Sequence, residues 1–433
     1  MTVPAETWLL ISHAFNMDGR AASQTVTDKI PHLLVRGIRP IVISAVTGRR
    51  DAQLEHHQVL APLPSGLRFD LRHWLRARLA PGWRQRLALA AVAVVLAPFY
   101  WLEKILVPLD SHWSWFLSAR AVGGAVIRRA RPRLVYSSGG ASSAHLAGYL
   151  LARRYGLPWI AEVHDPMVYQ DWSGGPIRRR WALWIESLIC RHADLAWWFT
   201  PTALARARER HPQLGARGHL LYPGANPPAA GAVYAKGAVF VLAHFGSLAR
   251  NRNLAFMLDG LSRLLAAHPE YRKELRLRTY GGDWDEVSRA ALGAFAFPDV
   301  VEAIGRLETD PATGVSGRER ALRAMRGTDC LLLLHGVDAF CQEYFPSKLY
   351  EYLWMQRPIL GVVHDNADLL RLLEAHGHCA VRAGDTDALV RSLESLVARW
   401  RDAGLPDSGR PSPFPAEAAV ARIAEWTRTL GRG

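Results

Sequence analysis

The strongest constraint on the fold is a regular alternation of short apolar runs with amphipathic stretches, which occurs in two series along the chain. The first series lies at residues 8–11, 41–43, 134–136 and 159–161, and the second at 240–243, 275–280, 331–334 and 359–363. Amphipathic segments such as 254–267 and 388–400 lie between them. Strand, helix and strand at this spacing predict parallel sheets covered by helices, which is the α/β class.

A segment rich in proline and glycine, at residues 223–231, separates the two series. This composition predicts a hinge between two domains, at about 1–225 and 238–412. A chain of 433 residues is also too long for one small core. We therefore expect two Rossmann-like, doubly wound domains that face each other across a cleft. Ligands are expected beyond the carboxyl ends of the strands, and so in that cleft.

The charge balance limits the classes of binding partner. Lysine and arginine number 53 against 39 acidic residues, which gives a net charge of +14. Such a charge admits nucleic acid, an anionic membrane surface or a phosphorylated substrate. We expect no nucleic acid, because no basic and aromatic motif of a known module occurs. The four cysteines show no metal-ligand spacing and fit a reducing cytoplasm, and we expect no leader peptide, because Pro4, Glu6 and Thr7 precede the first apolar run.

One region, at about 66–118, breaks the alternation. Six arginines between Arg68 and Arg86 lead into residues 87–102, which are uncharged and contain Pro98. These 16 residues are fewer than the roughly 18–20 that span a bilayer. Five tryptophans lie beside or at the end of this run, at positions 74, 83, 101, 113 and 115. The pattern predicts a basic, aromatic-rimmed hairpin that lies in the surface of an anionic membrane. A buried helix pair and a true membrane span are the alternatives.

The segment 340–353 carries the clearest chemistry. Pro346 suits the first turn of a helix, and the amides of Ser347, Lys348 and Leu349 would then be free to bind an anion such as a diphosphate. Glu343 would lie just before this helix and Glu351 about one and a half turns inside it. The alternative is an ordinary helix with two solvated glutamates.

This segment resembles the E-x7-E signature of retaining, GT-B-fold glycosyltransferases of family four, in a subset that often makes bacterial surface polysaccharides. The resemblance covers most of the chain except residues 60–115. It implies that Glu343 contacts the donor sugar and that Glu351 holds the nucleotide ribose. It also implies that the last helix, within 413–433, packs back on the first domain.

Further segments match the same family in order. Residues 245–253 resemble its phosphate-binding loop, with Gly246 at the turn. Arg252 stands at the position of the family's diphosphate-binding lysine. Ser247 stands where the family has an arginine, and Arg250 would supply that phosphate contact instead. A solvated turn is the alternative. Gly19 resembles the glycine of the amino-terminal loop.

Histidines at predicted strand ends are the remaining candidates. His164, followed by Asp165 and Pro166, resembles the histidine that the family places beside the transferred sugar, although a strand-end histidine can also be purely structural. His13, His145 and His244 are weaker candidates.

The predicted function is retaining transfer of a hexose from a nucleotide sugar to a lipid-linked or saccharide acceptor, at the inner face of the cell membrane. Glu343, His164 and Arg252 are the predicted catalytic residues, and the predicted donor-binding residues are Glu351, Lys348, Ser347, Arg250, Gly19 and Gly246. We expect no metal and no cofactor besides the donor, although Asp283 and Asp285 form one D-x-D pair. A nucleotide-sugar 2-epimerase and a non-catalytic GT-B scaffold remain alternatives.

Overall fold

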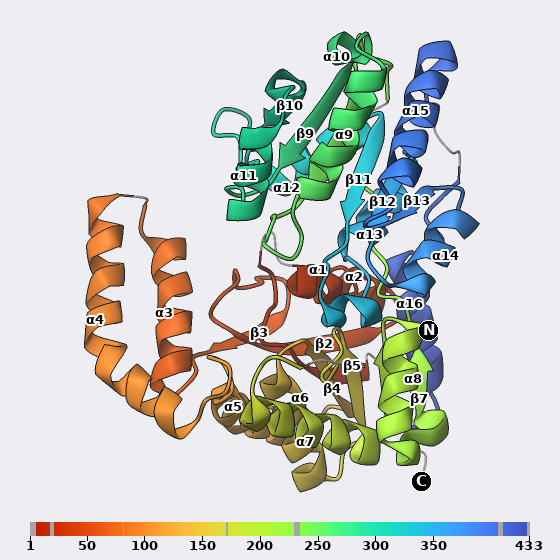
Figure 1. The fold of residues 1–433 in the computed structure, drawn as a ribbon. Coiled ribbons are helices and arrows are strands. Elements are labelled where there is room, and N and C mark those ends of the chain that lie inside the picture. Colours follow the sequence, from red (N-terminus) through yellow and green to blue (C-terminus); the bar gives the residue numbers. More distant parts are fainter. Residues whose placement is uncertain are drawn as a thin grey trace. The chain divides into compact units, whose positions relative to one another are not determined.

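A computed structural model describes residues 6–17, 21–80, 82–169, 172–228, 234–405 and 410–430. The chain divides into two compact units. The first unit comprises Met1–Gly224 together with Ala416–Gly433, and the second comprises Ala225–Pro415. Figure 1 shows the helices and strands of both units, and each unit is described by itself.

The first unit is built on a parallel sheet of seven strands in the order β3-β2-β1-β4-β5-β6-β7. Their bounds are β1 (Glu6–Ile11), β2 (Ile38–Ala45), β3 (Glu55–Val59), β4 (Leu134–Gly139), β5 (Trp159–Val163), β6 (Leu195–Trp198) and β7 (Gly218–Leu220). Leu9 of β1 pairs with Ile41 of β2 on one side and with Val135 of β4 on the other. The direction in which the chain adds strands reverses between β1 and β4, and such a reversal is where doubly wound sheets bind ligands.

Helices of the first unit cover both faces of this sheet, and two of the helices form a hairpin apart from it. They are α1 (Ala21–Thr27), α2 (Ile30–Val35), α3 (Pro64–Arg78), α4 (Trp83–Leu106), α5 (Trp115–Ala130), α6 (Ser142–Tyr155), α7 (Pro176–His192), α8 (Pro201–Arg210), the 3-10 turn η1 (Pro212–Arg217) and α16 (Ala416–Thr427). Successive residues of β1 face opposite sides: Leu9 and Ile11 join one core cluster, and Trp8 and Leu10 join the other.

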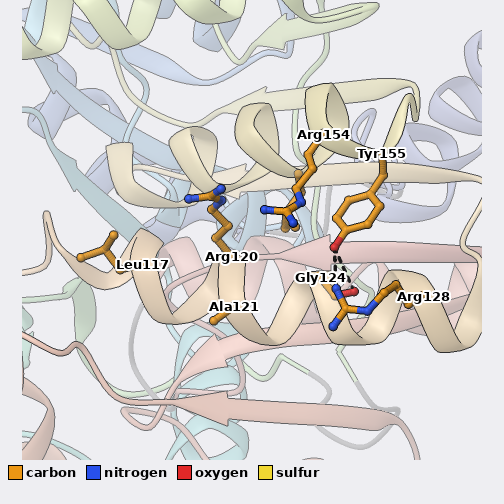
Figure 2. A pocket seen from close by; sticks show the side chains of 8 residues that line it. Leu117, Arg120, Ala121, Gly124, Arg128, Arg154 and Tyr155 are labelled. Atoms are coloured by element: carbon orange, nitrogen blue, oxygen red, sulfur yellow. Dashed lines mark hydrogen bonds between the residues drawn. The ribbon is translucent and has the colours of Figure 1, made fainter.

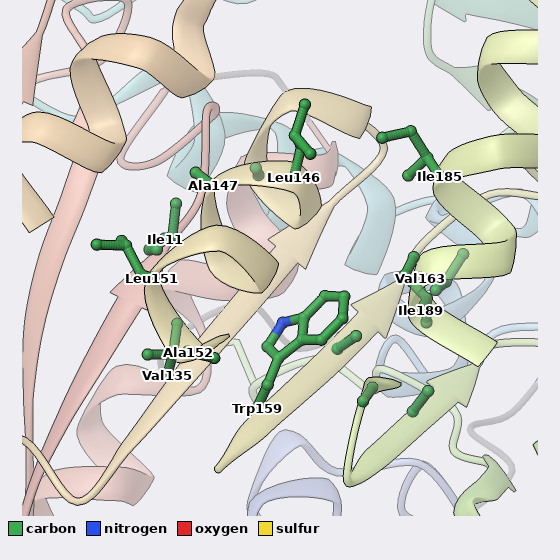
Figure 3. Packing of buried hydrophobic residues seen from close by; sticks show 14 of the residues in the cluster. Ile11, Val135, Leu146, Ala147, Leu151, Ala152, Trp159, Val163, Ile185 and Ile189 are labelled. Carbon is green, nitrogen blue, oxygen red and sulfur yellow. The ribbon is translucent and has the colours of Figure 1, made fainter. Parts of the chain in front are cut away.

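The first of these clusters lies between the sheet and helices α5, α6 and α7. Figure 3 shows the part of it beneath α6 and α7. The Trp159 indole is buried there, and its Nε1 donates to Ser137 Oγ at 2.8 Å. A Cβ on Gly148 of α6 would lie 2.9 Å from that same Nε1, so only glycine lets the helix approach the ring this closely.

The carboxy-terminal helix α16 belongs to the first unit. Val420 and Ile423 of α16 lie in the second core cluster, beside Trp8 and Leu10. Arg133 Nη2 donates to the carbonyl of Thr427 at 2.6 Å.

The second unit repeats the plan with a parallel sheet of six strands in the order β10-β9-β8-β11-β12-β13. The strands are β8 (Phe240–Phe245), β9 (Leu275–Tyr280), β10 (Val301–Ala303), β11 (Cys330–Leu334), β12 (Ile359–Val363) and β13 (Cys379–Arg382). The helices and 3-10 turns are α9 (Ala255–Ala267), α10 (Tyr271–Glu274), α11 (Glu286–Ala294), η2 (Pro298–Val300), α12 (Gly317–Arg326), η3 (Ala339–Glu343), α13 (Lys348–Trp354), α14 (Ala367–Ala375) and α15 (Thr386–Ala403). The reversal here lies between β8 and β11. The predicted α/β class with two parallel, doubly wound sheets is confirmed.

Helices α3 and α4 form a hairpin that packs side by side away from the sheet (Figure 1). Trp101 and Ile105 of α4 are 63% and 76% exposed, so the alternative of a helix pair buried within the chain is wrong. Helix α4 is also longer than the uncharged run of 16 residues, because it continues through Pro98 and comprises 24 residues. By length and composition alone, α4 is the one helix of the described residues that is long and apolar enough to cross a membrane.

Two buried carboxylates attach the hairpin to the rest of the unit. Glu103 of α4 accepts hydrogen bonds from the amide of Ser65, at 2.7 Å, and from Trp113 Nε1, at 2.8 Å. Asp70 of α3 accepts from the amide of Ala61 at 2.8 Å, and burial raises the pKa of its carboxyl to about 7. These contacts fix the base of the hairpin.

Candidate functional site

In the first unit, three adjacent strands end in small or polar residues at the carboxyl edge of the sheet. Ser12 and His13 follow β1, Gly139 ends β4, and His164 follows β5. These strands flank or adjoin the reversal between β1 and β4. This edge is therefore the expected ligand site of the first unit.

His164 is held by a hydrogen-bond network that no sequence motif predicted. Its Nε2 lies 2.8 Å from Glu162 Oε1 and 3.0 Å from Ser138 Oγ, and its ring stacks on Phe199 with centroids 4.9 Å apart. Because the Glu162 carboxylate only accepts, Nε2 carries the proton and donates it. No hydrogen bond within the described ranges uses Nδ1 of His164, so Nδ1 is the nitrogen left for a ligand.

Glu162 is a fully buried carboxylate with donors on both oxygens. Lys29 Nζ lies 3.1 Å from it, Tyr136 Oη donates at 2.6 Å, and Trp197 Nε1 donates at 3.1 Å. Burial alone would raise the pKa of Glu162, but Lys29 and the hydrogen bonds from His164 and Tyr136 hold it below its ordinary value. The side chain beside His164 is thus a permanent anion.

Another histidine braces the small-residue loop at the end of β4. His145 Nε2 donates to the carbonyl of Gly139 at 3.1 Å, and Nδ1 accepts from Ser137 Oγ at 2.9 Å. Burial lowers the pKa of His145 to about 4, which keeps it neutral. Both ring nitrogens are used within the loop, so His145 is structural. The predicted loop residue Gly19 lies outside the described residues.

In the second unit, β8 ends at a tight turn made by Gly246. Its φ of 148° is a conformation that residues with a Cβ rarely adopt, and its amide donates to the carbonyl of Tyr280 at 2.8 Å. A Cβ on Gly281, which follows β9, would lie 2.2 Å from the Gly246 carbonyl oxygen. Two glycines therefore bring the ends of β8 and β9 together, next to the reversal between β8 and β11.

The two predicted arginines in the loop after Gly246 differ in exposure and in hydrogen bonding. Arg252 is half-buried: its Nη2 donates to the carbonyl of Ser247 at 2.9 Å, whereas its Nε is buried without a hydrogen-bond partner among the described residues. Arg250 is exposed. Backbone hydrogen bonds in both directions between Ala249 and Arg252 close the loop and hold Arg252 in place.

His244, at the penultimate position of β8, lies below this loop. Its Nδ1 donates to the carbonyl of Leu332 at 3.1 Å, and its buried Nε2 has no hydrogen-bond partner in the described part of the chain. Burial, together with the charges of Arg252 and Lys348, lowers the pKa of His244 to about 4. The charges of two predicted phosphate-binding residues therefore both disfavour a positive charge on His244.

Glu351 lies in an ion-pair cluster. Its Oε2 is 2.6 Å from Lys348 Nζ, and its Oε1 is 3.3 Å from Arg318 Nη2 of α12. Burial would raise the pKa of Glu351, but Lys348 and Arg318 hold it below its ordinary value. The carboxylate is thus ionised, and both of its oxygens can only accept hydrogen bonds. Arg318 was not predicted.

The helix after β11 starts later than predicted. Helix α13 begins at Lys348, so Pro346 lies outside it and Glu351 falls in its first turn. The amide of Leu349 donates to the carbonyl of Pro346 at 2.9 Å, so the prediction that this amide is free is wrong. Ser347 stands at the cap position without a side-chain capping bond. Glu343 ends η3 and is buried.

One member of the D-x-D pair, Asp285, has a structural role. Asp285 caps α11, where its Oδ1 accepts from the amides of Val287 and Ser288 at 3.0 and 3.2 Å. Within the described residues, no group of three or more potential metal ligands occurs.

No protein-family model matches the chain, and no curated protein sequence matches it. Solved structures do. A sucrose-phosphate synthase from Thermosynechococcus elongatus superposes with a TM-score of 0.62 at 13% identity, covering 98% of both chains. TarM superposes with a TM-score of 0.63 at 6% identity, over 98% of this chain and 99% of TarM. A UDP-forming trehalose-phosphate synthase from Burkholderia vietnamiensis gives 0.55 at 12% identity, over 98% and 96% of the two chains.

The chain has the GT-B fold. At such low identities the likeness establishes the fold alone. In GT-B terms, the predicted residues divide between the two Rossmann-like units: His164 lies in the first, and Gly246, Arg250, Arg252, Glu343, Ser347, Lys348 and Glu351 lie in the second. Within the second unit, Lys348 pairs with Glu351, and the charges of Lys348 and Arg252 both lower the pKa of His244.

Proposed function

We propose that this protein is a retaining, metal-independent hexosyltransferase that uses a nucleotide-sugar donor. The proposal is carried by the loop after β8, where the glycine turn at Gly246 and the closed backbone between Ala249 and Arg252 hold the Arg252 guanidinium in place. A diphosphate supplies the negative charge that such a site binds, and guanidinium binds phosphate through two parallel hydrogen bonds. Sharing a fold with sugar synthases, one of them named UDP-forming, supports this choice.

The ion-pair cluster at Glu351 suits the nucleoside. Its carboxylate is ionised and only 13% of the side chain is exposed, so it can accept from vicinal ribose hydroxyls in a site of low dielectric. Lys348 neutralises it and keeps its own ammonium beside the phosphates. Glu343 would contact the donor sugar, as the resemblance implies.

The transfer breaks the bond between the anomeric carbon and the diphosphate oxygen and forms a bond from the acceptor hydroxyl on the same face. Arg252 and Lys348 stabilise the charge that develops on the leaving diphosphate. A leaving phosphate oxygen takes the acceptor proton. His164 positions the sugar through Nδ1, since Nε2 is committed to Glu162.

The test is transfer itself. The whole protein is incubated with nucleotide sugars and with lipid-linked or free saccharide acceptors, with and without EDTA, and NMR follows the anomeric protons. We expect a product of the donor's anomeric configuration and no effect of EDTA. Release of a free 2-epimer without an acceptor would indicate an epimerase, and no turnover of any donor would favour the non-catalytic scaffold.

We further propose that the α3–α4 hairpin holds the enzyme on the inner face of the cell membrane, where a lipid-linked acceptor for polysaccharide or glycoconjugate synthesis is available. The exposed tryptophans and aliphatic side chains of α4 suit the headgroup boundary. Helix α3 packs along α4 and carries Arg68, Arg72, Arg76 and Arg78. Crossing as a hairpin would carry these arginines into hydrocarbon, which favours lying in the surface.

Vesicle flotation tests the membrane proposal. We expect the protein to float with phosphatidylglycerol vesicles much more than with phosphatidylcholine vesicles. Trp101→Ser and Arg72→Ala each reduce flotation. Trp101→Ser removes apolar area that would enter the membrane, and Arg72→Ala removes attraction to anionic lipid. Val35→Ser, which changes an apolar residue 84% exposed on α2, leaves flotation unchanged. Flotation that ignores both lipid charge and the two hairpin substitutions contradicts the proposal.

A further inference from the structure

A pocket of about 290 Å³ lies between α5 and α6 of the first unit, on the outer surface of these helices. It is lined by Leu117, Arg120, Ala121, Gly124, Arg128, Leu151, Arg154 and Tyr155 (Figure 2). Arg120 and Arg128 come from α5, and Arg154 comes from α6. Three of the eight lining side chains are therefore guanidinium groups, and none is acidic.

The surrounding sequence supplies no counter-charge. Between Asp110 and Glu162 the chain contains seven arginines and no aspartate or glutamate. Glu55 of β3 is the acidic group that reaches α5, and it pairs with Arg129 and His57, outside the pocket. Among the residues that the structure describes, no ion pair involves any of the three pocket arginines. Like charges gathered without a carboxylate repel one another unless an anion binds between them.

The pocket is partly preorganised. Arg128 Nη1 donates to Tyr155 Oη at 2.8 Å, and Figure 2 shows this contact above Gly124. A Cβ at Gly124 would lie 2.8 Å from Tyr155 Oη and 3.6 Å from Arg128 Nη1, so glycine makes room for both. A neutral phenol thus orients Arg128 without cancelling its charge.

This pocket is separate from the ligand edge of the same unit. Helix α5 ends four residues before β4 begins, and α6 ends four residues before β5 begins. Arg128 and Arg154 on their last turns therefore lie toward the edge where these strands start. His164 lies at the opposite edge, where β5 ends.

We propose that this pocket is a second, non-catalytic binding site for a phosphate group. Arg120, Arg128 and Arg154 bind its oxygens, and the half-exposed Leu117 contacts the part of the ligand that follows. A lipid headgroup and a soluble phosphate compound offer the same group. Phosphate binding at this pocket does not require the transfer reaction.

The experiment compares two double variants of the full chain. Arg120→Ala/Arg154→Ala removes two charges from the pocket, and Arg129→Ala/Arg153→Ala removes two exposed charges from the same helices outside it. One arm titrates inorganic phosphate and pyrophosphate by calorimetry. The other measures binding to phosphatidylcholine vesicles with and without phosphatidic acid. Thermal melting confirms that both variants are folded.

We expect phosphate-dependent binding in at least one arm, weakened about tenfold or more in the pocket variant and within about twofold of wild type in the control. Loss only in the vesicle arm identifies a lipid headgroup as the source, and loss in the soluble arm identifies a soluble phosphate. No binding in either arm, or equal losses in both variants, overturns the proposal.

Discussion

Replacing Lys29 with methionine lowers the free energy of unfolding by about 3–5 kcal/mol at neutral pH. Lys29 and Glu162 are both buried, and their charged groups lie 3.1 Å apart. Methionine keeps most of the volume and removes the positive charge, so an ionised carboxylate stays buried without its cation. Four neutral or titratable donors remain on Glu162, but none carries a permanent charge.

The loss of stability caused by Lys29→Met depends on pH. The folded-state pKa of Glu162 lies below its ordinary value, so its contribution is present at neutral pH and is lost as the pH falls through that low pKa. Without Lys29 the pKa of Glu162 rises, because burial is then less opposed, and protonation relieves the variant in mild acid. Urea unfolding at pH 7 and pH 4 measures both effects. The control, Lys273→Met at an exposed position, changes stability little. A Lys29→Met protein as stable as wild type at pH 7 would show that the pair contributes nothing.

Replacing Arg252 with alanine lowers the transfer rate by about 10²–10³-fold with little loss of stability. Its guanidinium is held by the Ser247 carbonyl and by the closed backbone of its own loop. It is therefore positioned before the diphosphate develops charge. Arg252→Lys restores part of the rate, because it keeps the charge and loses the planar fork.

Initial rates of nucleotide release with a fixed donor and acceptor measure this effect. Arg263→Ala, which removes an exposed arginine of α9, keeps the wild-type rate. If Arg252→Ala transfers sugar within about twofold of wild type, the leaving diphosphate does not depend on that guanidinium.

Apolar periodicity located the central strands and missed others. All eight predicted runs lie in strands of the two sheets, namely β1, β2, β4, β5, β8, β9, β11 and β12. The strands that were missed lie at or toward the edges, and two of them show why. Glu55–Val59 is mostly polar, and Val301–Ala303 has only three residues. Edge strands bury less of their surface, so their sequences carry a weaker pattern.

Sequence motifs could not predict which residues form ion pairs with the site carboxylates. Lys29 meets Glu162 across 133 residues of sequence, and Arg318 meets Glu351 across 33. One signal was available: Glu162 stands within an otherwise apolar strand, and a charge in a buried strand needs a partner. Which residue supplies that partner depends on packing between distant helices and strands.

For the α3–α4 hairpin, the sequence indicated the character of the segment but not the length of its helix. Its apolar and basic composition was evident, but α4 is longer than the uncharged run. Charged residues extend it at both ends, Arg84 and Arg86 at the amino end and Glu103 and Lys104 at the carboxyl end. Arginine is a good helix former, so a charge boundary is not a helix boundary.

Binding of a nucleotide to the second unit is the most direct test of the donor site. Thermal shifts with UDP, GDP, dTDP and CMP are measured on wild type, Glu351→Ala and the control Glu374→Ala, which changes an exposed glutamate of α14. A ligand at 100 times its dissociation constant adds about 2.7 kcal/mol of stability. The account predicts that one nucleotide raises the melting temperature of wild type and of Glu374→Ala and loses this effect in Glu351→Ala. No shift with any nucleotide, or an equal shift in all three proteins, would contradict it.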